Sequence, residues 1–163
     1  MSTLTELLAV VALLGSALVA GVFFAFSSFV MGALARLPAA QGVAAMQSIN
    51  VVVLNRSFLG LFVGTTVVSA VLAGLAAFGW GSASAPWYVA GALSYLAGTF
   101  GVTGMGNVPL NDRLAAVPAE GAEAVAVWEH YLVRWTRLNT LRTIAAAGAA
   151  LMLLLGLLRG GVV

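Results

Sequence analysis

The sequence contains no cysteine and no lysine, only one histidine, and few charged residues of either sign. The absence of cysteine excludes disulfide bonds, thiolate metal sites and a cysteine nucleophile. Charged residues make up 7% of the chain, whereas a soluble globular domain carries about a quarter of its residues as charged side chains. So few charges cannot cover a surface that faces water on all sides.

Most of what is present is apolar. Hydrophobic residues make up 62% of the 163 residues, and the mean hydropathy is +1.08. The composition does not shift along the chain, so residues 1–163 are predicted to form a single domain. The net charge of +2 comes from scattered arginines, and binding of nucleic acid, which needs clustered cations, is not predicted. The expected partner is a lipid bilayer, in a bacterial plasma membrane.

Four segments are predicted to cross this bilayer as helices. A crossing takes roughly 20 apolar residues at 1.5 Å per residue. The first segment contains Glu6 and is too long for a signal peptide, which would start with basic residues. Residues 57–111 carry no charge and are too many for one crossing, and the sequence GWGSASAP at 79–86 divides them as a turn. The predicted spans are 4–34, 49–78, 87–105 and 138–158.

The longest polar segment, residues 106–137, precedes the last span. Pro118 with Glu120 and Glu123 is typical of a helix start, because acidic residues suit the first turn. Beyond it, aromatic and polar residues recur every three or four positions and share one helical face: Trp128, Tyr131, Trp135, Asn139 and Arg142. His130, Arg134 and Arg137 lie on another face. The predicted fold is therefore an all-α membrane protein, a four-transmembrane-helix bundle with an interfacial helix before the fourth span.

Small residues indicate where helices approach one another in lipid. Gly60 and Gly64 are spaced by four in the second span, as are Ala17 and Gly21 in the first, a pattern typical of close helix packing. The third span carries a stripe of glycines at positions 98, 101, 104 and 106. A dinucleotide-binding loop is not predicted from this stripe, because the preceding strand and the full motif are absent. A homo-oligomer remains open.

Arginine placement predicts the topology. Arg36, Arg113, Arg134 and Arg137 fall in the connections after the first and third spans. The excess of basic residues on the cytoplasmic side of membrane proteins then places both connections in the cytoplasm and both termini outside.

Two further arginines, Arg56 and Arg142, lie at membrane depth. A charge in hydrocarbon costs at least ~2.5–3.5 kcal/mol, so it usually faces the protein interior and has a partner there. Alternatively, the long arginine stem lets the charge reach the interface. Arg142 lies in line with Trp135 and Asn139, which favours a polar site. No metal site is predicted, because His130 is the only histidine and no motif links it to the acidic residues.

The residues that carry a resemblance lie mostly in the second half of the chain. The string Asn107-x-Pro109-x-Asn111-Asp112-x-Leu114 and the spaced Trp128, Tyr131, Trp135, Asn139, Arg142 set resemble the anthrone oxygenase-like membrane proteins, the DUF1772 family. Ile49-Asn50 and Pro86-Trp87 are similar too. The resemblance implies a cofactor-independent monooxygenase, since some relatives oxidise an anthrone to an anthraquinone with molecular oxygen and no cofactor. Most relatives have no assigned activity.

Such a reaction needs a pocket for a flat apolar or aromatic ligand, donors for an enolate oxygen, and a base. The candidate bases are Asp112 and His130, with His130 preferred because histidine titrates near neutral pH, and Arg142 completes the catalytic candidates. The predicted substrate-binding residues are Asn107, Asn111, Trp128, Tyr131, Trp135 and Asn139, with Phe23, Phe24, Phe26 and Phe100 as further lining.

Two alternatives stay open. The Trp, Asn and Arg set can instead clamp the interfacial helix onto the bundle. The chain can also be a non-catalytic membrane protein that binds a small apolar ligand or assists assembly. A transporter is not predicted, because no internal repeat is evident. An enzyme or a binding protein should gather its polar groups in one closed pocket.

Overall fold

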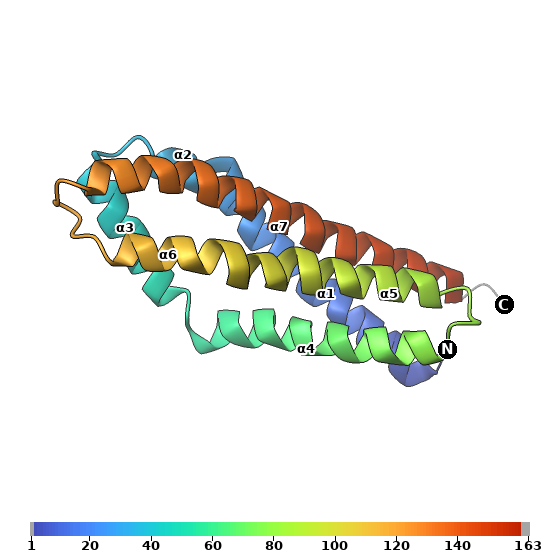
Figure 1. Ribbon diagram of the computed structural model, residues 1–163. Helices are drawn as coiled ribbons and strands as arrows, with labels where there is room; N and C mark the ends of the chain where they lie inside the picture. Colours follow the sequence, from blue (N-terminus) through green and yellow to red (C-terminus); the bar gives the residue numbers. More distant parts are fainter. Residues whose placement is uncertain (1, 161–163) are drawn as a thin grey trace.

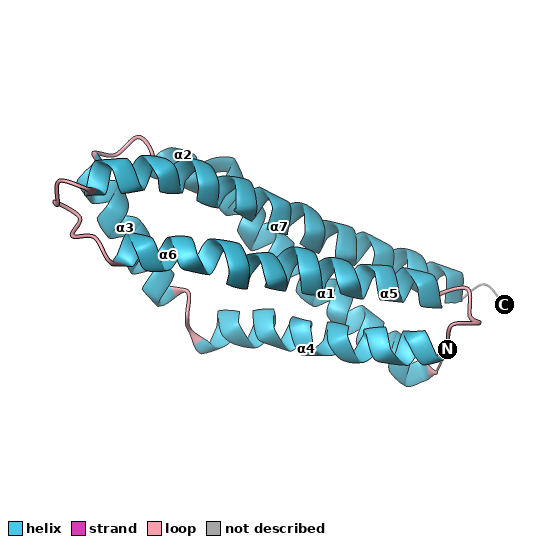
Figure 2. Cartoon of the chain, in the orientation of Figure 1, coloured by secondary structure: helices cyan, strands magenta, loops and turns pink. Residues whose placement is uncertain are grey.

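The computed structural model describes residues 2–160, and within them the chain is helical and contains no strand (Figure 2). The first long helix, Thr3–Leu34, joins α1 (Thr3–Ala25), the π-helical turn η1 (Phe26–Val30) and α2 (Met31–Leu34). The other helices are α3 (Ala39–Val52), α4 (Arg56–Phe78), α5 (Ala85–Leu93), the π-helical η2 (Ser94–Gly101) and η3 (Thr103–Asn107), α6 (Val108–Ala115) and α7 (Ala124–Gly160).

The long helices form a bundle whose axes run in roughly the same direction (Figure 1). Helix α1 packs against α7 over the most extensive contact, α4 packs against α1 and α5, and α5 packs against α7. The α4–α5 turn lies at the end of the bundle where α1 begins and α7 ends, here called the terminal end (Figure 1). The opposite end is formed by α3, α6 and the first turns of α7.

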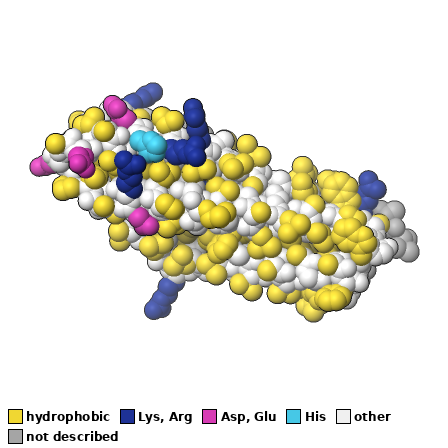
Figure 3. Space-filling model, viewed as in Figure 1, with side chains coloured by type: hydrophobic (Ala, Val, Ile, Leu, Met, Phe, Trp, Pro, Cys, Tyr) yellow, Lys and Arg dark blue, Asp and Glu magenta, His cyan; other side chains and the backbone are white. Residues whose placement is uncertain are grey.

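Three helices are long and apolar enough to cross a membrane: Thr3–Leu34, Arg56–Phe78 and Ala124–Gly160. Charged side chains gather over the end formed by α3, α6 and the start of α7, called the charged end from here on (Figure 3). The face towards the terminal end is mostly apolar, which is the surface expected of helices in lipid.

Asn55 divides a segment that the sequence analysis took as one helix starting at Ile49. Its Nδ2 donates to the Val52 carbonyl at the end of α3, and its Oδ1 accepts from the Phe58 amide at the start of α4. Asparagine is a favoured N-cap because its side chain replaces a missing helical hydrogen bond. The prediction of a continuous helix 49–78 is therefore wrong at its start, and the chain changes direction at 53–55.

The helix that follows the α4–α5 turn continues beyond the predicted end at Met105 and reaches Ala115. Its second half alternates π-helical and α-helical turns, and Pro109 lies in the first turn of α6. Proline cannot donate to the preceding turn, and π-helical turns accommodate such an irregularity. Residues 106–115, about a third of the segment predicted as a polar connection, are thus part of this long helix.

Helix α7 begins at Ala124 rather than at Pro118, since residues 118–123 form turns. Its 37 residues are continuous and extend about 55 Å at 1.5 Å per residue. The helix predicted before the fourth span is therefore the first third of α7, and it runs on without a break into that span, as expected.

Close helix contacts use other glycines than the predicted pairs. Gly60, Gly64 and Gly21 are exposed, and a Cβ at any of them would meet nothing within 4 Å, so the prediction from their spacing is wrong for helix contacts within this chain. A Cβ at Gly156 would lie 2.5 Å from the Tyr88 ring, and one at Gly98 would lie 2.5 Å from the Ala145 Cβ. These glycines are required where α5 and η2 cross α7.

Candidate functional site

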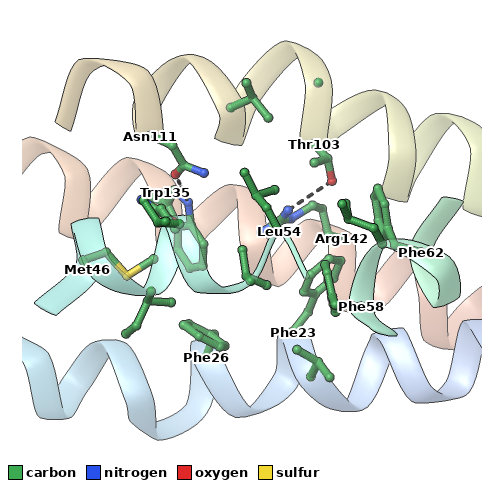
Figure 4. A pocket seen from close by; sticks show the side chains of 18 of the residues that line it. Phe23, Phe26, Met46, Leu54, Phe58, Phe62, Thr103, Asn111, Trp135 and Arg142 are labelled. Carbon is green, nitrogen blue, oxygen red and sulfur yellow. Dashed lines mark hydrogen bonds between the residues drawn. The ribbon is translucent and has the colours of Figure 1, made fainter. Parts of the chain in front are cut away.

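A cavity of about 550 Å³ lies between the first long helix, the break after α3, the start of α4, the π-helical segment and α7 (Figure 4). Its walls are mainly aromatic and aliphatic, and its larger side chains are Phe23, Phe26, Met46, Phe58, Phe62, Phe100 and Trp135. Polar groups at its wall are few: Gln47, Asn50, Thr103, Asn111, Asp112 and Arg142. A concave apolar site with a few placed polar groups is the usual form of a small-molecule site.

The break between α3 and α4 creates this space. Because Asn55 ends one helix and starts the next, α4 begins away from α7 and from the long helix 85–115 (Figure 1). The Phe58 and Phe62 rings stack at 5.9 Å and turn toward Phe23, with Phe23 and Phe62 at 6.2 Å. These rings hold the start of α4 against the first helix and leave its other side open to the cavity.

Arg142 carries the only charge that is buried at the cavity wall within residues 2–160; its side chain is 4% exposed. Its Nη1 donates to Thr103 Oγ1 at 3.0 Å, and its Nη2 donates to Asn139 Oδ1 at 2.7 Å. The guanidinium lies 4.0 Å from the Phe23 ring centroid. All of these contacting groups are uncharged, and within residues 2–160 the Arg142 Nε has no hydrogen-bond partner. A buried cation without an anion is costly, since buried charges are normally paired.

Asn139 fixes the position of that cation. It is fully buried, and its Nδ2 donates to the Phe23 carbonyl and to Ser27 Oγ, both at 2.7 Å. Both acceptors lie at the junction of α1 with the π-helical turn η1. Arg142 is therefore connected through Asn139 to the first helix, on the far side of the bundle from Thr103.

Asn111 presents a donor to the cavity, and its orientation is determined by its neighbours. Its Oδ1 accepts from Tyr131 Oη and from Trp135 Nε1, both at 2.8 Å. The indole N–H is a donor only, so the atom that faces it must be the amide oxygen. The Asn111 Nδ2 consequently turns away from Trp135 toward the cavity (Figure 4).

The aromatic residues of α7 form a stacked column. Trp128, Tyr131 and Trp135 are separated by ring-centroid distances of 5.8 Å, with interplanar angles of 15° and 20°. Trp135 lies at the cavity wall, Tyr131 lies behind Asn111, and Trp128 packs on Gly42, where a Cβ would meet its indole at 2.8 Å. The column thus joins α3 to α7 and exposes one ring to the cavity.

The predicted site residues therefore separate into three groups. Asn111, Asp112, Trp135 and Arg142 line the cavity, whereas Tyr131 and Asn139 lie directly behind its wall. Asn107 is buried and donates to the Trp135 carbonyl, and Trp128 packs on α3; neither lines the cavity. Of the predicted lining phenylalanines, Phe23, Phe26 and Phe100 are at the wall, whereas Phe24 is exposed on the outside.

His130 lies on a different surface. It is exposed in a shallow depression of about 480 Å³ that also contains Arg113 and Arg134. Asp112 is exposed at the rim of the aromatic cavity. The structure thus brings Asp112, but not His130, to the cavity that contains Arg142. Arg56 is exposed at the first turn of α4, consistent with an arginine that reaches the interface.

Several cavity residues were not predicted from the sequence. Thr103, Phe58 and Phe62 carry no distinguishing spacing, because threonine and phenylalanine are common in apolar helices. Gln47 donates to the Leu114 and Val117 carbonyls and so holds α3 against the end of α6. Asn50 belongs to the Ile49-Asn50 pair that contributed to the family resemblance, which was the only signal for it.

No group of three or more His, Cys, Asp or Glu side chains that could hold a metal ion occurs in the described residues. The polar groups at the cavity wall are an arginine, amides, a threonine hydroxyl and a single carboxylate, that of Asp112. Cationic and amide donors suit an anionic or carbonyl oxygen rather than a cation.

The fold and site define an integral membrane protein with an aromatic cavity against Arg142, the one buried cation in residues 2–160. The family model for anthrone oxygenase matches residues 56–152, more than half of the chain. The chain belongs to the anthrone oxygenase family. Comparisons with curated proteins and with solved structures give no match. The matched range contains Phe58, Phe62, Thr103, Asn111, Trp135 and Arg142, whereas the walls contributed by the first helix and α3 lie before it.

Proposed function

We propose that this chain is a cofactor-independent oxygenase that binds a flat aromatic ketone of the anthrone type in the cavity and oxidises it with molecular oxygen. The observation that carries the proposal is Arg142, a buried cation with neutral neighbours in an apolar, aromatic cavity. Such a cation is suited to an anion that forms inside the cavity during the reaction.

The proposed membrane arrangement has four spans. The helical segment 85–115 is the fourth crossing, beside the three helices that are long and apolar enough. The charged end, with its excess of arginines, lies in the cytoplasm and the terminal end outside, in a bacterial plasma membrane. The cavity then lies near the cytoplasmic boundary of the hydrocarbon.

The reaction begins with loss of a proton from the CH₂ group opposite the ketone. The resulting enolate carries its charge on the ketone oxygen, where the Arg142 guanidinium and the Asn111 Nδ2 donate hydrogen bonds. Donors placed where charge develops are the largest catalytic term in many enzymes, especially where water is excluded. Asp112, at the cavity rim, is the base of this proposal because it is the carboxylate at the cavity wall; His130 would require the substrate on the other surface.

The later steps balance without a cofactor. The enolate gives one electron to O₂, and the radical and superoxide combine into a C–O bond, which yields a hydroperoxide after protonation. The same carbon then loses its second hydrogen as a proton while the O–O bond breaks, which gives a new C=O group and water. One O₂ is consumed, one of its atoms enters the quinone, and the other leaves as water.

The aromatic lining of the cavity also favours a flat ligand. Trp135 and phenylalanine rings of the first helix, α4 and η2 line the wall, and Phe26 packs directly on Trp135 with ring centroids 5.8 Å apart. Ring faces and edges bind aromatic surfaces through offset and tilted contacts. A tricyclic ketone presents this surface on both sides and one oxygen at its centre line.

The competing function is a binding protein without turnover, for which the same cavity and cation would hold an anionic apolar ligand. The test is to reconstitute the purified protein in lipid, supply 1,8-dihydroxyanthrone, and measure oxygen uptake and quinone absorbance. Turnover above the spontaneous oxidation seen in protein-free vesicles supports the oxygenase. Saturable binding of the ligand with an oxidation rate equal to that background identifies the binding protein instead.

A further inference from the structure

One side of the cavity is open, between the first two turns of α4 and the helix 85–115. Val63 on α4 and Phe100 on η2 line the cavity and are nevertheless 45% and 44% exposed. Leu59 and Val108 also line the cavity and are exposed on the outside of the bundle. The edges of this opening are therefore apolar, whereas the rim near Asn50 and Asp112 combines these polar side chains with exposed Val51 and Leu54.

The opening faces the part of the surface that lipid covers. Helix α4 carries no charge after Arg56, and the helix 85–115 carries none before Asp112. Gly104 precedes Asp112 by eight residues, which is about 12 Å along a helix. In the proposed four-span arrangement, an apolar opening at this depth adjoins hydrocarbon rather than water.

Gly104 lies at this opening and lacks the packing role of neighbouring glycines. A Cβ at Gly106 would lie 2.9 Å from Leu138, and one at Gly98 would lie 2.5 Å from Ala145. A Cβ at Gly104 would meet nothing within 4 Å, although the residue lines the cavity. The missing side chain at Gly104 therefore leaves the opening wide rather than letting two helices touch.

We propose that the gap between α4 and η3–α6 is a lateral entrance through which a membrane-dissolved, flat aromatic ligand enters, and that Gly104 sets its width. This inference rests on the proposed function, in that the ligand is the one held at Arg142. The ligand enters as the neutral ketone or phenol, because an anion would be expensive to move through hydrocarbon. It becomes anionic only inside, where Arg142 stabilises the charge and the polar rim near Asn50 and Asp112 connects to water.

The entrance is tested with a ligand that need not react. Emodin, an anthraquinone phenol, absorbs at longer wavelength when ionised, so its colour reports occupancy of the Arg142 site. The protein is reconstituted in phosphatidylcholine vesicles and mixed with emodin in a stopped-flow instrument. The variant is Gly104→Phe, and the control is Gly74→Phe, since Gly74 is exposed, lies outside the cavity and also has nothing within 4 Å of an added Cβ.

In Gly104→Phe, association and dissociation should both slow by about tenfold or more while the Kd stays within roughly twofold, because an entrance changes rates in both directions. Gly74→Phe should match the wild type. A third variant, Ala115→Phe, narrows the rim on the water side and should leave the rates unchanged.

The entrance would be overturned by unchanged rates in Gly104→Phe, by slowing in Ala115→Phe alone, or by no colour change with the wild-type protein. A weaker Kd at an unchanged association rate in Gly104→Phe would also overturn it, since the added ring would then occupy the cavity rather than narrow an entrance. The oxygenase proposal fails separately, if emodin binds with these kinetics but 1,8-dihydroxyanthrone is not turned over.

Discussion

The two ends of the bundle use similar apolar residues to opposite effect. At the terminal end, α5 and α7 touch through Gly91 and Gly156, and the Tyr88 side chain between them is fully buried. At the charged end, Asn55 turns the start of α4 away from α7, and the rings of Phe58 and Phe62 hold it against Phe23 of the first helix. The comparison shows that glycines, which lack a side chain, let the helices pack closely at the terminal end, whereas a helix break leaves a cavity at the charged end.

The largest effect is expected at the open end, from Arg142→Met. Turnover of 1,8-dihydroxyanthrone should fall by about 10²–10³, the loss seen when one oxyanion donor is removed. The fold should survive, because methionine fills similar space and removes a buried charge whose described contacts are neutral. Oxygen uptake and thermal unfolding of the same sample measure both quantities.

Arg134→Ala is the matched control, since Arg134 is exposed on another face of α7; its turnover and Tm should equal those of the wild type. If Arg142→Met lowers the Tm sharply and retains activity in the protein that folds, Arg142 clamps the helices and does not serve catalysis.

The next largest effect is expected at the closed end, from Gly156→Leu. A side chain there would collide with the Tyr88 ring, and overpacking of this kind typically costs about 1–3 kcal/mol. Gly60→Leu, at an exposed position with open space, should leave stability unchanged. Melting curves in one detergent compare the two variants, and equal Tm values would show that the terminal end is not closed by glycine contacts.

A smaller effect is expected from Thr103→Val, which keeps the shape and removes one hydrogen-bond partner of Arg142. A single such bond contributes about 0.5–1.5 kcal/mol, or roughly two- to tenfold in kcat/KM. The control is Thr66→Val, which removes the hydrogen bond from the Thr66 hydroxyl to the Phe62 carbonyl and does not touch Arg142. Equal kinetics for the two variants would mean that Thr103 does not position the guanidinium during the reaction.

No effect is expected from metal removal. Dialysis against a chelator should leave turnover within experimental scatter, because the cavity wall offers a single carboxylate, Asp112, among cationic, amide and hydroxyl groups. Elemental analysis of the purified protein should find no stoichiometric metal. Loss of activity on dialysis and its return with one metal ion would contradict the cofactor-independent mechanism.

The inner face of α7 could be predicted from the sequence, because spacing alone determines which residues share a helical face. Trp128, Tyr131, Trp135, Asn139 and Arg142 are all buried on it. The same spacing already placed His130 on another face, and its preference as a base came from residue type alone. A residue type that suits a reaction says nothing about where the side chain points.

The cavity itself could not be predicted. It depends on the change of direction at 53–55, and Asn55 was taken as an interior residue of an apolar helix although asparagine is also a common helix cap. The pairs of small residues around Gly60 and Gly21 were misleading for a related reason. Spacing shows that two residues share a face, but only the packing of the whole bundle decides whether that face meets a helix or lipid.

The unneutralised charge of Arg142 also links ligand binding to the stability of the protein. An anionic ligand that binds the folded state should raise the Tm, and at a concentration of 100 times its Kd it adds about 2.7 kcal/mol. Most of this ligand-induced stabilisation should be lost in Arg142→Met, because this variant has no buried cation to pair with the anionic ligand. Thermal melting of the wild type and this variant, across a collection of acidic aromatic compounds, can therefore identify the natural ligand without any assay for the reaction.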